Sequence, residues 1–309
     1  HKKSAVCSER VEFFLGVRDE PRLAGQNLAD RADQTGNVLD TIQYFVVLIA
    51  EDDVAVLSHD FDDQLFAAQK IVDGRGMLCN FLENHDKTRI IDRFLMPEDQ
   101  NRYSEKMLPV TNFFLPGIVF LYQGQEIGMQ NARFNSVDEF DDISTKDQYR
   151  MAREAGLSDA EALAVCSAMS RDNARTPMQW DDSANAGFTT GTPWIKVNDN
   201  YPVINVEKEE GQPDSVLHYY RKLIALRKSG EYRELFTYGK FEPAYENADH
   251  VMAYYRILQG RRVLVAANFG TDTIELDWEV PAKKVLLSNK KRTNAENKLI
   301  LEKCEVFVT

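Results

Sequence analysis

Residues 78–86 decide the fold of this chain, and they read Leu78-Cys79-Asn80-Phe81-Leu82-Glu83-Asn84-His85-Asp86. A short apolar run follows the turn residues at 73–76 and ends in a polar cluster, which is the pattern of a buried β-strand. The polar cluster then lies at the carboxyl end of that strand. Because functional side chains gather at this end of parallel strands, we expect Asn84, His85 and Asp86 to belong to a binding site.

A helix and a second strand follow the first. Apolar residues recur at helical spacing in 103–115, and Pro116-Gly117 separates this segment from the apolar run 118–122. This run also ends in polar residues, at 123–126. Strand, helix and strand in this order predict parallel strands with both polar clusters at the same end. Pro109 is expected in the first helical turn, where its missing amide hydrogen removes no helical bond.

The rest of the chain divides into a loop-rich part and a β-rich part. Residues 134–213 are rich in Asp, Asn, Gly and Thr and predict long loops with one short helix at 158–168. A helix is then predicted from an N-cap at Asp214-Ser215 to a C-cap at Gly230. Beyond residue 236, short β-type runs predict a small antiparallel β-sandwich, with strands at 251–255, 263–267, 274–276, 284–287 and 305–308.

Composition and charge exclude several classes of partner. The 309 residues, 43% of them hydrophobic, suffice for one large domain and a smaller one. A net charge of −12 without a basic run argues against nucleic acid or anionic lipid and favours a small neutral substrate. No apolar stretch approaches the roughly 20 residues that a membrane helix needs. The four scattered cysteines predict neither a zinc site nor a disulfide framework, but reduced thiols in the cytoplasm.

The polar cluster at 84–89 combines an amide, an imidazole, a carboxylate and, at Arg89, a guanidinium. Such a set is suited to binding sugar hydroxyls. The triplet Asn84-His85-Asp86 taken alone fits an Asx-type turn with a hydrogen-bonded histidine better than a binding site. Its meaning therefore depends on the motifs that accompany it.

Two longer motifs follow the triplet in order, at Gly117–Met129 and at Ser170–Trp180. Together with Asn84–Arg89 they resemble the oligo-1,6-glucosidase branch of the α-amylase superfamily, and a fourth stretch at 186–206 extends the resemblance. It covers about residue 74 to the C-terminus. The resemblance implies the C-terminal part of a (β/α)8 barrel in residues 1–235, poorly matched over 1–68, followed by the β-sandwich domain at 236–309.

The resemblance also implies a retaining glycosidase with an Asp nucleophile, a Glu acid/base and a second Asp after strand seven. Asp86 matches that second Asp, which stabilises an oxocarbenium-like transition state. Asn84 and His85 are then expected to bind sugar hydroxyls, and Arg171 to bind the sugar at the non-reducing end. No cofactor and no metal are expected.

Other candidate residues carry alternatives. Arg89 is expected to contact substrate, to pair with Asp86 or to lie near the nucleophile, and the alternative is a solvent-facing loop arginine. Glu126 is a second-rank candidate for binding substrate. Three large aromatic residues could stack on sugars but are expected more often in a small local core, namely Trp180, Phe188 and Trp194. The carboxylates at 138–142 are expected to form a solvated face.

The Gly-Phe-Arg-x-Asp segment that carries the nucleophile in this branch is not found in the sequence. The nearest match to the acid/base phrase is at 14–21, where Glu20, or Asp19, is the candidate and a solvent-exposed turn is the alternative. We therefore expect a fragment that does not hydrolyse glucosides by itself. Open sheet edges and an exposed apolar face should also make it prone to associate.

Two functions remain open at this point. The first is an α-glucosidase acting on the non-reducing end of short isomalto- or malto-oligosaccharides. The second is a catalytically inactive amylase-like interaction module, as in the heavy chains of amino-acid transporters. Polar residues kept together at Asn84, His85, Asp86 and Arg171 favour the enzyme, because an inactive module has no reason to keep them.

Overall fold

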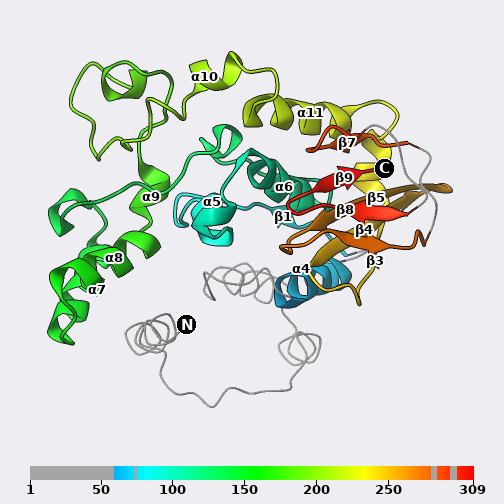
Figure 1. The fold of residues 1–309 in the computed structure, drawn as a ribbon, viewed down its shortest axis with the longest axis horizontal. Helices are drawn as coiled ribbons and strands as arrows, with labels where there is room; N and C mark the ends of the chain where they lie inside the picture. The colour runs from blue at the N-terminus through cyan, green and yellow to red at the C-terminus, as the bar shows by residue number, and fades with distance from the viewer. Residues whose placement is uncertain (1–58, 73–74, 280–283, 293–297) are drawn as a thin grey trace.

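The computed structural model describes residues 59–72, 75–279, 284–292 and 298–309. Figure 1 shows an antiparallel sheet on one side, a helical region built from α7 and α8 on the other, and β1, α5 and α6 between them. Within the described residues, no helix combines the length and the apolar character needed to cross a membrane.

Two parallel strands form the centre of the strand–helix–strand unit. β1 (Cys79–Asn80) pairs in parallel with β2 (Ile118–Val119), with Cys79 opposite Ile118. The predicted order and direction are confirmed, although the strands are shorter than the apolar runs. The helical elements before and between these strands are α4 (His59–Val72), α5 (Ile90–Phe94), η1 (Pro97–Asp99) and α6 (Arg102–Phe113).

Helix α6 corrects the expectation for Pro109. Asn101 caps the helix by accepting hydrogen bonds from Tyr103 N and Ser104 N, and Ser104 Oγ accepts from Asn101 N in return. This capping box fixes the start of the helix at Arg102. Pro109 consequently lies in the middle of the helix and is buried, so the helix lacks one internal backbone donor there.

The loop-rich part contains more helix than predicted. Helix α8 (Asp159–Met169), capped by Ser158, confirms the helix expected at 158–168. Helix α7 (Ile143–Glu154) was not predicted, and its N-cap is Asp142, which is buried instead of lying on a solvated face. The remaining short elements are η2 (Gln125–Ile127), η3 (Val137–Glu139), α9 (Asp172–Arg175), η4 (Ala184–Gly187) and α10 (Val206–Glu210).

Helix α11 (Val216–Lys228) agrees with its predicted start. Ser215 Oγ accepts a hydrogen bond from His218 N, as expected of the N-cap. The C-cap is Ser229 and not Gly230, because the Ser229 hydroxyl and amide both donate to Leu226 O. A further helix, α12 (Arg233–Tyr238), runs across the predicted domain boundary at residue 236, which stays a prediction.

The C-terminal strands are antiparallel throughout, as predicted. A five-stranded sheet has the order β3-β4-β5-β9-β7, and β6 pairs with β8 in a separate sheet. Strands β3 and β8 were not predicted. The strands are β3 (Lys240–Ala244), β4 (Val251–Leu258), β5 (Arg261–Asn268), β6 (Ile274–Leu276), β7 (Leu287–Ser288), β8 (Leu299–Leu301) and β9 (Val306–Val308).

The five-stranded sheet is covered on both faces. One face packs on α6, α11 and α12 in a core that includes Phe114, Leu223, Phe236 and Tyr254. The other face shares a second core with β6 and β8, in which Leu299 and Leu301 are fully buried. The sheet and helices α4, α6, α11 and α12 therefore share one continuous apolar core, against which Val119 of β2 packs.

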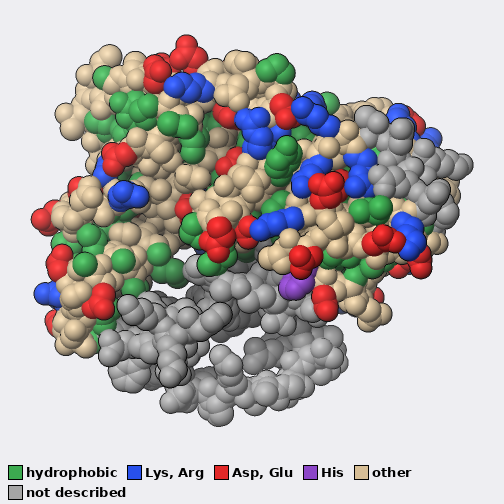
Figure 2. All heavy atoms as spheres, viewed as in Figure 1, with side chains coloured by type: hydrophobic (Ala, Val, Ile, Leu, Met, Phe, Trp, Pro, Cys, Tyr) green, Lys and Arg blue, Asp and Glu red, His purple; other side chains and the backbone are tan. Residues whose placement is uncertain are grey.

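The expected exposed apolar side chains are present beside β1 and β2. Met77, Ile118 and Phe120 each keep about half of their surface accessible, and Leu121 somewhat less. Charged side chains elsewhere are mixed in sign. On the face of the described part drawn in Figure 2, acidic and basic side chains are interspersed without a continuous basic patch.

Candidate functional site

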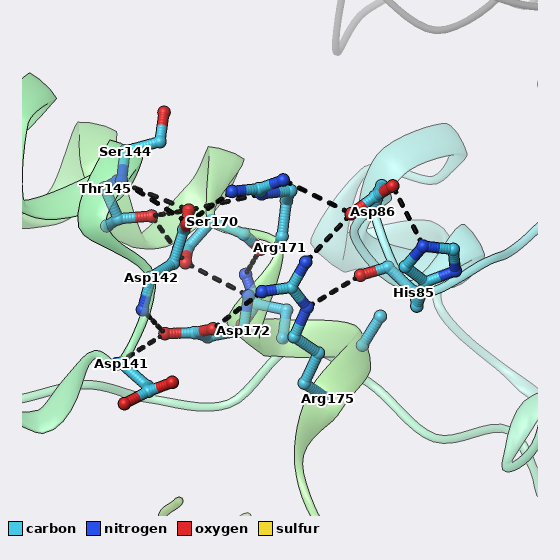
Figure 3. A network of polar contacts seen from close by, with 12 residues as sticks. His85, Asp86, Asp141, Asp142, Ser144, Thr145, Ser170, Arg171, Asp172 and Arg175 are labelled. Carbon is cyan, nitrogen blue, oxygen red and sulfur yellow. Dashed lines mark hydrogen bonds and ion pairs between the residues drawn. The ribbon is translucent and has the colours of Figure 1, made fainter.

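The polar cluster after β1 folds into a tight turn. Asn84 Oδ1 accepts a hydrogen bond from Asp86 N at 2.8 Å, and Lys87 N donates to Asn84 O at 3.3 Å. The Asx-type turn considered from the sequence is therefore present. It does not compete with a binding role for the neighbouring residues, because the side chains of His85 and Asp86 are exposed and Asp86 points toward Arg171 and Arg175 (Figure 3).

The Asp86 carboxylate is contacted by three basic side chains, shown in Figure 3. Its Oδ1 accepts from Arg175 Nη2 at 2.8 Å and from Arg171 Nη1 at 3.3 Å. Its Oδ2 lies 3.1 Å from Nε2 of His85. The carboxylate remains 43% exposed, so it is held in place but still open to a ligand.

The structure brings Arg171 to Asp86 and adds Asp142, which the sequence reasoning missed. Arg171 donates two hydrogen bonds to Asp142, from Nη2 to Oδ1 at 2.5 Å and from Nε to Oδ2 at 3.3 Å. Burial acts to raise the pKa of Asp142, but hydrogen bonds from Arg171 and Thr145 outweigh it, and the net pKa is lowered. Asp142 is thus an ionised anchor that fixes Arg171 beside Asp86.

Arg175 is a second residue that the sequence reasoning did not single out. Its Nε donates to His85 O at 2.9 Å while its Nη2 binds Asp86, and its Nη1 lies 3.8 Å from Asp172 Oδ1. Asp172 is fully buried, and its Oδ2 accepts from the amides of Asp141 and Asp142. Helix α9 and the start of α7 are thereby linked to the turn that carries Asp86.

Arg89 does not lie where it was expected. Its side chain is 0% exposed, and its Nη1 donates to Glu83 Oε2 at 2.9 Å and to Gln123 O at 2.8 Å. Both the predicted pair with Asp86 and the alternative of a solvent-facing arginine are wrong. The guanidinium instead joins the loop after β1 to the loop after β2, because a buried charge needs a buried partner of opposite sign.

The two polar clusters do lie at the same end of β1 and β2, as their Arg89 contacts show. Glu126, in η2, is partly buried and lies near Glu83 but is not part of the network drawn around Asp86. Glu20 lies outside the described residues. Trp180, Phe188 and Trp194 are each about half exposed, so the prediction that they form a small core is wrong.

The described residues contain no group of three or more His, Cys, Asp or Glu side chains arranged to hold a metal ion. The side chains that do gather around Asp86 are two guanidiniums, an imidazole and two further carboxylates. Such fixed charges and donors can bind the hydroxyls of a neutral ligand and stabilise positive charge that develops next to Asp86.

Comparison with known families identifies the class. The model for the alpha-amylase catalytic domain matches residues 50–238, which is more than half of the chain. The chain therefore belongs to the α-amylase family, as the motifs indicated. Family membership and the solved structures similar to it imply a TIM-barrel-type fold with a C-terminal antiparallel sheet.

The similar proteins are glucosidases and related enzymes. The oligo-1,6-glucosidase of Parageobacillus thermoglucosidasius is 40% identical over 236 residues, covering 74% of this chain and 41% of that protein. The glucan 1,6-alpha-glucosidase of Streptococcus pneumoniae is 37% identical over 74% of this chain and 42% of its own. The chain thus spans less than half the length of these curated relatives.

Two solved structures have a fold similar to that of this chain. The trehalulose synthase MutB of Pseudomonas mesoacidophila MX-45 superposes with a TM-score of 0.74 at 34% identity, covering 81% of this chain and 46% of that one. The trehalose-6-phosphate hydrolase of Bacillus licheniformis gives a TM-score of 0.75 at 34% identity with the same coverage.

Proposed function

We propose that this chain provides the sugar-binding part of an α-glucosidase that acts on the non-reducing end of short α-glucosides. The observation that carries the proposal is the Asp86 carboxylate, held by Arg171 and Arg175 yet 43% exposed. The oligo-1,6-glucosidases among the relatives support isomalto-oligosaccharides as substrates, with malto-oligosaccharides as the neighbouring class.

The roles follow from charge and position. The Asp86 carboxylate stabilises the oxocarbenium-like transition state of a retaining glycosidase, because the two arginines hold it in position before the reaction begins. His85 binds an adjacent sugar hydroxyl. Arg171, 40% exposed and anchored by Asp142, binds the terminal sugar. The nucleophile and the acid/base are not supplied by the described residues of this network.

The architecture that we propose is the C-terminal part of a (β/α)8 barrel followed by a β-sandwich domain. The parallel β1–β2 pair and the antiparallel C-terminal sheets support it. The chain by itself is then catalytically silent, because half a barrel leaves the reacting sugar without its nucleophile. Free thiols at Cys79, Cys166 and Cys304 fit a reducing, cytoplasmic setting.

Sugar binding by the chain tests the proposal directly. Titration with 1-deoxynojirimycin, a cationic glucose mimic, should shift NMR signals of residues 84–87 and 171–175. Asp86→Asn should weaken this binding about 10- to 100-fold, because a hydrogen bond to a charged group contributes about 1.5–3 kcal/mol. Equal affinity of wild type and Asp86→Asn, or no binding by the wild type, would refute the proposed site.

Turnover provides the second test. The purified chain should not hydrolyse p-nitrophenyl α-glucoside, and robust turnover would contradict the silent-fragment proposal. In a chimera, this chain replaces the matching segment of the Parageobacillus oligo-1,6-glucosidase. There, Asp86→Asn should lower kcat about 100-fold or more, as removal of a group that stabilises transition-state charge does. An unchanged kcat in an active chimera would rule out that role.

One observation favours the alternative of an inactive interaction module. Apolar side chains at Met77, Ile118 and Phe120, which lie in or beside β1 and β2, are each about half exposed, as at a protein interface. An interaction module should retain its partner when Asp86 and Arg171 are both replaced. Loss of sugar binding without loss of any partner would separate the two functions.

A further inference from the structure

We propose that Arg175 is a positioning residue that holds Oδ1 of Asp86 and thereby directs the other oxygen, Oδ2, which lies 3.1 Å from Nε2 of His85, toward the ligand. The inference rests on the proposed function, because it takes Asp86 as the carboxylate that binds sugar. It assigns different tasks to two arginines that contact the same oxygen. Arg175 fixes the carboxylate, whereas Arg171 is available to the sugar.

Arg175 holds the turn at two points within one dipeptide. Nε donates to the backbone carbonyl of His85 at 2.9 Å, and Nη2 donates to Oδ1 of Asp86 at 2.8 Å. The first bond fixes the backbone of the turn, and the second fixes the rotation of the Asp86 side chain. Only a planar guanidinium offers two donors in this rigid geometry, so a lysine cannot replace it.

The guanidinium of Arg175 is itself held by a buried carboxylate. Its Nη1 faces Asp172 Oδ1 at 3.8 Å, an oxygen that is buried and has no hydrogen bond of its own. The other oxygen of Asp172 accepts the amides of Asp141 and Asp142. An arginine held by a buried carboxylate loses little further freedom in gripping Asp86, which makes the orientation of Asp86 well defined.

Arg171 differs in each of these respects. Its contact with Asp86 is longer, at 3.3 Å, and its shorter bond goes to Asp142 instead of to the turn. Its side chain is 40% exposed, against 22% for Arg175. Arg171 can therefore exchange Asp86 for a sugar hydroxyl without releasing the turn, and Arg175 cannot.

Hydrogen–deuterium exchange of the intact chain tests this division of tasks. Arg175→Lys keeps a positive charge beside Asp172 but loses the two-point grip. It should speed exchange at the amides of Asp86 and Lys87 about tenfold, the equivalent of one lost hydrogen bond. Exchange in β4 and β5 should stay at the wild-type rate. Arg171→Lys, the matched control, should leave the turn unchanged.

The same two variants are compared in the titration with 1-deoxynojirimycin. Both should weaken binding, but only Arg175→Lys should combine weaker binding with a looser turn. Wild-type exchange rates at Asp86 and Lys87 in Arg175→Lys, or equal acceleration in Arg171→Lys, would overturn the inference. If the wild type binds no sugar, the proposed function fails, and the exchange rates still decide whether Arg175 positions the turn.

Discussion

The buried pair of Arg89 and Glu83 allows a quantitative prediction about stability. Both side chains are 0% exposed, and their charged atoms are 2.9 Å apart. Glu83 Oε1 also accepts the amide of Ile90 at 2.8 Å, and Arg89 also binds Gln123 O. Replacing Arg89 by Met keeps an apolar chain of similar length but leaves Glu83 buried without its counter-charge.

The expected loss in the free energy of unfolding depends on which charged side chain remains buried. Breaking a buried ion pair from one side costs about 3–5 kcal/mol, so Arg89→Met should lower the free energy of unfolding by that amount near pH 8. Glu83→Gln keeps an acceptor for Ile90 N but leaves the buried Arg89 guanidinium without a counter-charge, so it should also cost about 3–5 kcal/mol. The double variant should cost about 2 kcal/mol less than the sum, because it leaves no unpaired carboxylate.

The pH dependence has a defined sign. Burial raises the pKa of Glu83, with Arg89 opposing the rise, so loss of Arg89 should raise that pKa further. A buried carboxyl with a raised pKa stabilises the folded state at low pH, and this stability is lost as pH rises. Arg89→Met should therefore be less destabilised at pH 5 than at pH 8.

Urea denaturation of the four proteins, followed by far-UV circular dichroism at both pH values, measures these terms. A coupling below about 0.5 kcal/mol, the usual limit of additivity, would refute the assignment of Arg89 as the internal partner of Glu83. A loss of sugar binding in Arg89→Met without loss of stability would restore the substrate-binding role first expected from the sequence.

Three further predictions concern stability. Burial, reinforced by the charge of Glu209, raises the pKa of Glu105 to about 7. The free energy of unfolding should therefore fall by up to about 3 kcal/mol between pH 4.5 and 7. Glu105→Gln should remove this pH dependence, as measured by urea denaturation across that pH range. Arg256→Met should cost about 3–5 kcal/mol, seen as a lower urea midpoint, because fully buried Arg256 donates to three backbone carbonyls; an unchanged midpoint would contradict this. Gly117→Ala should cost about 1–3 kcal/mol in the same assay, because Gly117 has φ +120° and an added Cβ would meet Leu78 O at 2.3 Å; Pro116→Ala, next to it, serves as the control.

Much of the local structure was readable from the sequence. The parallel order of β1 and β2, the position of α8, the N-cap of α11 and the antiparallel C-terminal strands follow from periodicity and capping residues that act within a few positions. One of the errors was local as well. Pro109 was misplaced because the capping box at Asn101, one of several polar residues there, fixes where the helix begins.

The sequence by itself determined the family and singled out Asn84, His85, Asp86 and Arg171 as candidate site residues, because these lie in ordered motifs that can be recognised along the chain. Only the tertiary structure decided which charges meet. Arg175 and Asp86 are 89 residues apart, and a sequence with 37 basic and 49 acidic residues permits far too many pairings for spacing to choose among them. Burial decides the pairing, because Arg89 is buried and pairs with the buried Glu83, whereas Arg171 and Arg175 remain at the surface and bind Asp86.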